Sequence, residues 1–192
     1  MTENRQAPAC FRNDINSHFL DECLRQMAEK DMNALNDFYH HTKDSVYAYA
    51  LSVLKNPYDA QDVLHDCYLS VYANADQYHS NGKPLAWVFT IVKNLCLMKL
   101  RKQSRISDIS EQEWEGFIQT KTEMRTEDKL LLKECLFQLN DEERQIVTLH
   151  AVAGFKHWEI ARQLDLPLAT VLSKYHRSMK KLKEYIKRGE KL

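Results

Sequence analysis

The 192-residue sequence contains few of the residues that interrupt helices, with only four glycines and four prolines. Sandwiches and barrels need many such residues for their turns, so this scarcity argues against an all-β fold. Leu, Lys, Glu, Gln and Ala, which favour helices, are plentiful. Hydrophobic residues make up 44% and charged residues 28%, which is typical of a globular protein with a hydrophobic core. The composition therefore predicts an all-α fold.

Long apolar runs and paired cysteines are also missing. No stretch approaches the ~20 apolar residues of a transmembrane helix, and the first residues lack the basic and apolar segments of a signal peptide. The five cysteines form no CxxC pair and are odd in number. Free thiols in a reducing compartment fit this pattern, so we expect a cytoplasmic protein.

No familiar catalytic motif occurs in the sequence. There is no glycine-rich phosphate loop, no HExxH and no GxSxG. His150 and His157 lack a third partner at metal-ligand spacing and are expected to be packed or surface residues. We therefore expect no catalytic residue, no metal, no cofactor and no small-molecule substrate, and hence a protein that is not an enzyme.

The charges balance overall, with 27 Lys and Arg against 27 Asp and Glu, but they are unevenly distributed. Residues 170–192 carry eight basic and two acidic side chains, whereas residues 103–129 carry seven acidic and four basic ones. A basic stripe of this kind is suited to meeting phosphate. The C-terminal end is therefore a candidate surface for nucleic acid, although a lysine-rich helix can also be an ordinary solvated face.

Helical periodicity divides the chain into two parts. Apolar residues recur at helical spacing through the N-terminal half, where Pro57 interrupts the pattern and Asp59 is expected to cap a new helix. A further helix is expected from Leu85 to Lys102, after a turn that contains Pro84. We predict that four to five helices form one small domain, residues 16–102.

The periodicity disappears over residues 103–129, which we interpret as an acidic linker. It resumes with a helix over 130–139 and a second one that begins at an Asn140 cap, with Glu143 three residues later. These helices open a second small domain, residues 130–188.

The sharpest local signal is HWEIARQLDLPLATVLSKYHRSMKKL, residues 157–182, which predicts a helix-turn-helix with its turn at Asp165-Leu166-Pro167. The small residue Ala161 stands where the two helices should touch. The second helix would present its early polar and small residues to a major groove and its cations to phosphates. The residues assigned to these roles are Leu168, Ala169, Thr170, Ser173, His176, and then Lys174, Arg177, Lys180 and Lys181. A simple packing corner is the alternative.

Three segments together resemble the small extracytoplasmic-function (ECF) group of bacterial RNA polymerase sigma factors, in the sigma-70 family. They are NPYDAQDVLHDCYLSVY at 56–72, PLAWVFTIVKNLCLMKLRK at 84–102, and LNDEERQIVTLHAVAGFKHWEIARQL at 139–164. The resemblance implies two helical domains that bind core RNA polymerase and direct promoter recognition, DNA opening and transcription initiation. It also implies an anti-sigma partner, which in this group is often membrane-bound.

The resemblance assigns roles to individual residues. It places Asp59, Asp62, Asp66 and Leu69 on the helix that docks on the polymerase clamp. It places Trp87, Lys93, Asn94, Lys99, Arg101 and Lys102 at the minus-ten promoter element, and the helix-turn-helix at the minus-thirty-five element. Three residues depart from the family pattern: Met98, where an acidic residue is common, Ala169, where glycine is common, and Leu172, where a basic residue is common.

Two other functions remain open on the sequence. A stand-alone helix-turn-helix regulator would need a dimerisation surface, and no spare apolar helix is evident. A sigma-like interaction protein with weakened DNA contacts would account for Met98 and Leu172, but the retained cations after residue 173 argue against it.

Overall fold

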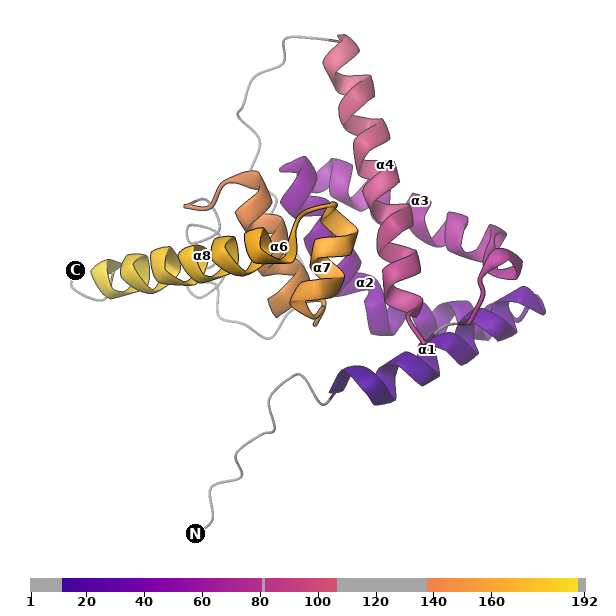
Figure 1. The fold of residues 1–192 in the computed structure, drawn as a ribbon. Coiled ribbons are helices and arrows are strands. Elements are labelled where there is room, and N and C mark those ends of the chain that lie inside the picture. Colours follow the sequence, from indigo (N-terminus) through magenta and orange to yellow (C-terminus); the bar gives the residue numbers. More distant parts are fainter. Residues whose placement is uncertain (1–11, 81, 107–137, 190–192) are drawn as a thin grey trace.

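The computed structural model describes residues 12–80, 82–106 and 138–189, and all its regular elements in that part of the chain are helices (Figure 1). Residues 107–129 of the expected linker, most of the expected helix over 130–139 and the N-terminal residues lie outside the described residues. Residues 103–106 are helical, so the prediction that the linker begins at residue 103 is wrong. The helices are α1 (Arg12–Ala28), α2 (Met32–Leu54), α3 (Pro57–Ala73), α4 (Pro84–Ile106), α6 (Asp141–Ala151), α7 (His157–Leu164) and α8 (Leu168–Gly189), with a short 3-10 turn, η2 (Ala75–Gln77), after α3. The all-α prediction is confirmed.

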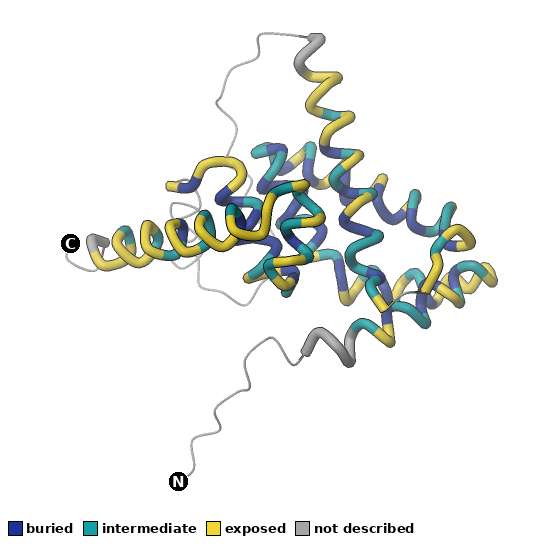
Figure 2. The backbone as a smooth tube through the Cα atoms, in the orientation of Figure 1, coloured by how far each residue is buried: buried dark blue, intermediate teal, exposed yellow. Residues whose placement is uncertain are grey.

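Helices α1 to α4 pack around one another, with α2 touching each of the other three. Their inward faces carry fully buried apolar side chains, and their outward faces are exposed, as the alternating colours along each helix show (Figure 2). This amphipathic pattern is the one that the apolar spacing predicts. The largest buried side chains of this part are Tyr49, Phe38, Phe89, Leu20, Leu24 and Met27.

Helix α3 begins one turn earlier than the sequence pattern indicates. Asn56 is its N-cap, since its Oδ1 accepts the backbone N–H groups of Tyr58 and Asp59 at 2.9 and 3.1 Å. Pro57 occupies the first helical position, where its missing N–H costs nothing. The prediction that Asp59 caps this helix is therefore wrong, because Asp59 lies in the first turn. Helix α4 likewise runs further than expected, to Ile106.

The second group of helices begins with a capping box. The Asn140 side chain accepts the N–H of Glu143 at 2.9 Å, and the Glu143 carboxylate accepts the N–H of Asn140 at 3.2 Å. This confirms the predicted start of α6. Helix α7 ends at Leu164 and is followed by its C-cap residue, Asp165, which adopts the left-handed conformation with φ 56°. Asp tolerates this geometry better than most residues, and it allows the sharp turn into α8.

The two groups of helices are in contact, since α2 packs on α6 and α4 packs on α7. Buried residues of both groups belong to one continuous hydrophobic cluster. Helix α8 extends away from this contact, as does the C-terminal half of α4 (Figure 1). Among the described helices, none is both long and apolar enough to cross a membrane.

Candidate nucleic-acid interface

Helices α7 and α8 form the helix-turn-helix that the sequence predicts. Ile160 of α7 and Val171 of α8 are fully buried between them, and Ala161 is half-buried at the contact. The N–H of Leu166 donates to the Ala161 carbonyl at 2.9 Å and so closes the turn. The small side chain of Ala161 lets the helices approach at this point. The first half of α8 is thereby held with one side in solvent.

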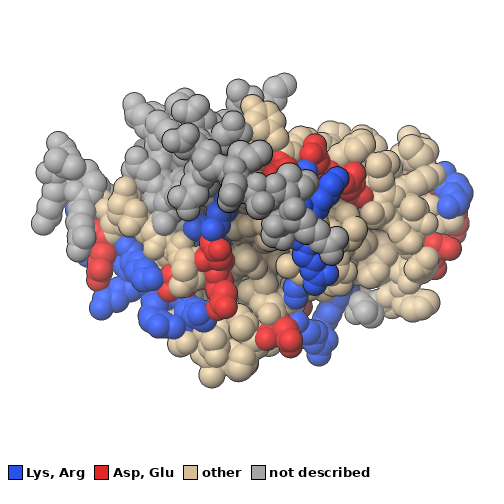
Figure 3. All heavy atoms as spheres, turned by 90° about the horizontal axis from the view of Figure 1, so that it is seen from above, with Lys and Arg blue, Asp and Glu red and all other residues tan. Residues whose placement is uncertain are grey.

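The outward side of the first half of α8 carries small, polar and basic residues together with two exposed leucines. Its exposed positions are Leu168, Ala169, Leu172, Ser173, His176, Arg177 and Lys180. In the view from above, Lys and Arg atoms lie both on the side where α8 lies and over the middle of the molecule, with acidic atoms beside them (Figure 3). The predicted groove-facing residues therefore share one exposed face, except for Thr170, which is half-buried.

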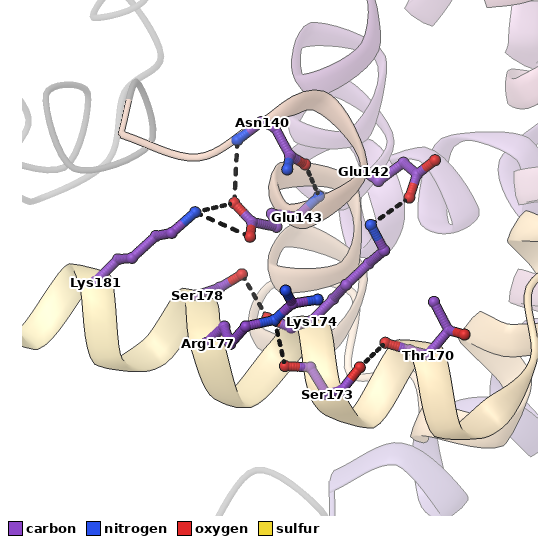
Figure 4. Close-up of polar contacts among 9 residues, drawn as sticks. All are labelled: Asn140, Glu142, Glu143, Thr170, Ser173, Lys174, Arg177, Ser178 and Lys181. Atoms are coloured by element: carbon purple, nitrogen blue, oxygen red, sulfur yellow. Dashed lines mark hydrogen bonds and ion pairs between the residues drawn. The ribbon is translucent and has the colours of Figure 1, made fainter.

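Two lysines of α8 point instead toward α6 (Figure 4). Lys174 Nζ lies 2.8 Å from the Glu142 carboxylate. Lys181 Nζ donates to both oxygens of Glu143, at 3.0 and 2.8 Å. These pairs connect the two helices. The structure thus assigns Lys174 and Lys181 an intramolecular role that the sequence pattern did not anticipate.

Glu143 is the centre of this connection, because its side chain is 4% exposed and accepts hydrogen bonds from Lys181 and from the Asn140 N–H. Burial by itself raises the pKa of this carboxyl group, but these bonds and the lysine charge outweigh burial and hold the pKa below its usual value. The carboxylate is therefore charged in the folded protein at neutral pH.

The other two predicted phosphate contacts remain on the exposed side. Arg177 Nε donates to the Ser173 carbonyl at 3.3 Å within α8. Lys180 is 80% exposed and lies 4.0 Å from Glu184, one turn away. Such an exposed pair contributes little energy, so Lys180 can exchange it for a phosphate at small cost.

Helix α3 presents an exposed stripe opposite its buried side. Tyr58 and Leu69 are exposed large hydrophobic residues, 74% and 58% accessible, and Asp62 and Asp66 lie between them along the exposed face. Three of the four predicted polymerase-binding residues are in this stripe. Sequence reasoning missed Tyr58, although its position four residues before Asp62 places it on the same helical face.

Asp59, the fourth residue, is turned toward α4. Lys99 Nζ lies 2.8 Å from Asp59 and 2.6 Å from Asp62, and Gln103 donates to Asp59 at 2.6 Å. Burial alone would lower the pKa of Lys99, but the two carboxylates outweigh it and raise the pKa. Lys99, predicted at the minus-ten element, thus connects α4 to α3.

The remaining minus-ten residues are spread along α4. Asn94, Arg101 and Lys102 are exposed, the last two on the projecting end of the helix. Lys93 is half-buried, and its Nζ donates to the carbonyl of Gln163 in α7 at 2.7 Å. The structure therefore places the predicted minus-ten residues on more than one side of α4.

Trp87, at the start of α4, is half-buried and packs on Tyr78, with ring centroids 5.2 Å apart. Tyr78 in turn donates its hydroxyl hydrogen to Asp21 of α1. This contact fixes the segment before α4 against α1. Trp87 thus has a structural contact in addition to its predicted role.

His150 and His157, which are expected to be packed or surface residues rather than metal ligands, stack on each other. The rings of His150 and His157 are 4.3 Å apart and nearly parallel, and Tyr175 of α8 meets both edge-on at 4.8 Å. His150 Nδ1 is 2.8 Å from the Phe155 carbonyl. The pair therefore packs α6 and α7 against α8, in agreement with the expectation of packed residues. No group of His, Cys, Asp or Glu in the described ranges is arranged to hold a metal.

Sequence profiles of one family match both parts of the chain. The profile described as Sigma-70 region 2 matches residues 38–106, and the profile described as Sigma-70, region 4 matches residues 129–182. Together they cover more than half of the chain.

Several curated relatives of the chain are named as ECF RNA polymerase sigma factors. The chain is 26% identical over 171 residues to the ECF RNA polymerase sigma factor SigK of Mycobacterium sp. strain KMS, covering 85% of this chain and 89% of that protein. The SigK protein of Mycobacterium tuberculosis strain H37Rv is also 26% identical over 171 residues, with 85% and 91% covered.

Two solved structures share the fold. One is CnrH in complex with the cytosolic domain of CnrY, with TM-score 0.63, 18% identity, and 88% of this chain and 98% of that chain covered. The other is the sigma factor RpoE in complex with the anti-sigma factor NepR from Bartonella quintana, with TM-score 0.66, 21% identity, and 79% and 96% covered.

Proposed function

Because this chain belongs to the sigma-70 family, within the ECF group, we infer that it is a sigma factor that binds core RNA polymerase and directs promoter recognition, DNA opening and transcription initiation. The observation that supports this most strongly is the order of the two matches, region 2 on α2–α4 and region 4 on the helix-turn-helix of α7 and α8. A stand-alone helix-turn-helix regulator would not need the domain that matches region 2.

We propose that the exposed stripe of α3 docks on polymerase. Tyr58 and Leu69 offer apolar contact, and Asp62 and Asp66 offer carboxylates that suit arginines of a partner. Asp59 supports this surface from within, through Lys99, rather than by direct contact.

For promoter DNA, we propose α4 for the minus-ten element and the outward side of α8 for the minus-thirty-five element. Lys93, Asn94, Arg101 and Lys102 supply cations and an amide for opened DNA. On α8, Ser173, His176 and the small residue Ala169 face the groove, while Arg177 and Lys180 face phosphates. Lys174 and Lys181 hold α8 in position from behind.

The family also bears on location, chemistry and regulation. Sigma factors recognise DNA and leave catalysis to polymerase, so we propose no catalytic residue, metal or cofactor here. Meeting core polymerase implies a cytoplasmic location. We further propose an anti-sigma partner, in keeping with the complex of the fold relative RpoE, and a division into domains at 16–102 and 130–188.

The test is run-off transcription from a library of promoters with core polymerase of the source organism, with and without the protein. Start sites that depend on the protein are the expected result, and their shared upstream sequences would give its specificity. If the chain neither binds core polymerase in a pull-down nor adds start sites, it is not a sigma factor, and a stand-alone helix-turn-helix regulator becomes the favoured hypothesis.

A further inference from the structure

Two leucines lie on the outward side of α8, in the part of the helix that would enter a major groove. Leu168 is 44% exposed and Leu172 is 37% exposed. They are one turn apart, so their side chains lie on the same face of the helix. Both belong to the first two turns of α8, and the N-terminal residues of a recognition helix are the ones that contact base edges. The pair is therefore placed to meet bases.

The packing of the helix-turn-helix depends on other residues. Ile160 and Val171 are fully buried between α7 and α8, and Ala161 is half-buried beside them. The two leucines, in contrast, keep more than a third of their surface in solvent. Removing such apolar surface from water stabilises a complex. Leu168 and Leu172 thus offer apolar contact to a partner of the helix.

The same part of α8 offers few hydrogen-bond donors to a base. Guanine is most often recognised by an arginine or lysine that donates to its O6 and N7. Lys174 points instead toward α6, with its Nζ 2.8 Å from the Glu142 carboxylate (Figure 4). The hydroxyl of Ser173 donates to the Thr170 carbonyl at 3.0 Å, within the helix. The exposed positions over 168–173 are Leu168, Ala169, Leu172 and Ser173, so all but one are apolar.

Thymine is the base that such a surface fits. Its edge in the major groove carries a C5 methyl group, which apolar side chains contact, whereas the other bases present only donors and acceptors there. Residues four apart are separated by about 6 Å along a helix, and successive base pairs are separated by about 3.4 Å. The two leucines can therefore meet methyl groups of thymines that are no more than about two base-pair steps apart.

Arg177 and Lys180 complete this arrangement, because they remain exposed further along α8 and can bind phosphates. Phosphate contacts orient a helix in the groove but carry no sequence information. We propose that Leu168 and Leu172 determine base specificity at the minus-thirty-five element by contacting the C5 methyl groups of thymines. This inference rests on the proposed function of α8.

The first test is run-off transcription from promoters whose minus-thirty-five element is randomised. Among start sites that depend on the protein, we expect thymine at two positions no more than two steps apart. Protein-dependent promoters without thymine in this element would overturn the proposal. If the protein adds no start site from any promoter, the proposed sigma function fails instead.

The second test removes the methyl group alone. In a selected promoter, each thymine of the minus-thirty-five element is replaced in turn by deoxyuridine, which differs only in lacking the C5 methyl group. Holoenzyme binding is measured by fluorescence anisotropy. Loss of one buried methyl group should weaken binding about fourfold. Unchanged affinity for every deoxyuridine promoter would show that no methyl group is recognised.

Leu168→Ala and Leu172→Ala assign each methyl group to one side chain. Each variant should lose the preference for thymine over deoxyuridine at one position and keep it at the other. Leu172→Met, which keeps an apolar side chain of similar size, should retain both preferences. Because both leucines are exposed, the melting temperature should stay that of the parent. Alanine variants that keep both preferences would show that other residues contact the methyl groups.

Ile186 provides a matched control, since it lies on α8 and is 37% exposed, like Leu172. It is about 21 Å further along the helix, outside the part that would enter the groove. Ile186→Ala should keep the preference for thymine over deoxyuridine. An equal loss of this preference in Ile186→Ala and Leu172→Ala would overturn the proposal. So would leucine variants that bind core polymerase more weakly and keep the preference, because the pair would then be a protein contact.

A last variant changes the preferred base. Leu172→Arg supplies the donors that guanine accepts, so it should favour guanine over thymine at one position by at least about fivefold. The preferred base is read from run-off transcription on the same randomised promoters. A preference for thymine that persists at both positions in this variant would show that Leu172 does not contact the base.

Discussion

Replacing either of two adjacent lysines of α8, Lys180 or Lys181, with alanine should change different properties of the protein. Both changes remove one positive charge from the same helix. Lys180 is exposed and weakly paired, whereas Lys181 is bonded to the buried carboxylate of Glu143. We therefore expect Lys180→Ala to weaken promoter binding and Lys181→Ala to lower stability.

For Lys180→Ala the magnitude follows from counterion release. Each lost phosphate contact reduces the slope of log affinity against log salt by about 0.9. Between 50 and 200 mM salt, a single contact accordingly changes the affinity by roughly three- to fourfold. The mutant should bind more weakly than the parent at low salt and approach it at high salt, with an unchanged melting temperature.

For Lys181→Ala the cost is that of a buried carboxylate left with fewer bonds. Two hydrogen bonds are lost and the one from the Asn140 N–H remains. A loss of about 1–2 kcal/mol is expected, which lowers the melting temperature by roughly 2–8 °C in a chain of this size. Its salt slope should stay that of the parent.

The assay is fluorescence anisotropy of holoenzyme on a promoter from the run-off library, at several salt concentrations, beside thermal unfolding of each isolated variant. The division of α8 into an outward DNA side and an inward structural side is wrong if Lys181→Ala reduces the salt slope and leaves the melting temperature unchanged. It is also wrong if Lys180→Ala leaves the salt slope unchanged.

Three further predictions concern other parts of the molecule. Asn140→Ala removes the cap of α6 and should cost about 1 kcal/mol in urea unfolding; an unchanged midpoint would contradict the capping box. Leu69→Glu should weaken core-polymerase binding in a pull-down at least tenfold, whereas Met32→Glu, also exposed but on α2, should not; equal losses would show that the α3 stripe is not the docking surface. Burial, then the charges of His150 and His176, lower the pKa of His157 below its ordinary 6.5, and its Nε2 is buried without a partner. The unfolded chain therefore binds a proton more readily than the folded chain, so stability should fall as the pH drops below about 6.5. In urea titrations from pH 7.5 to 5.5, His157→Gln should make the free energy of unfolding depend less on pH. An unchanged pH dependence in this variant would show that His157 is not the group responsible.

The start of α6 and the helix-turn-helix of α7 and α8 could be predicted from the sequence because their features are local. The Asn140 cap with Glu143, the small Ala161 and the Asp165 turn lie within a few residues of the elements that they shape. Such short-range patterns depend on backbone hydrogen bonding and helical spacing, which the sequence states directly. The same is true of the amphipathic faces of α2 and α3.

The partners of the charged residues could not be read in this way. Lys99 meets Asp59 from 40 positions away in the chain, and Lys93 meets the Gln163 carbonyl from 70 positions away. A basic residue looks the same in sequence whether it faces DNA or a carboxylate of another helix. Only the packing of α4 on α3 and α7 separates these alternatives, and packing is a property of the whole fold.

These partners bear on how tightly the isolated chain should bind DNA. Four of the predicted DNA-contacting cations, Lys93, Lys99, Lys174 and Lys181, are engaged within the molecule, three of them with carboxylates. Each cation that gives up an internal partner for phosphate gains less than an unpaired one, because the partner is left behind. Affinity from counterion release is correspondingly small for a chain whose net charge is zero. We therefore expect stable promoter binding to require contacts made by polymerase; tight promoter binding by the isolated chain would contradict this expectation.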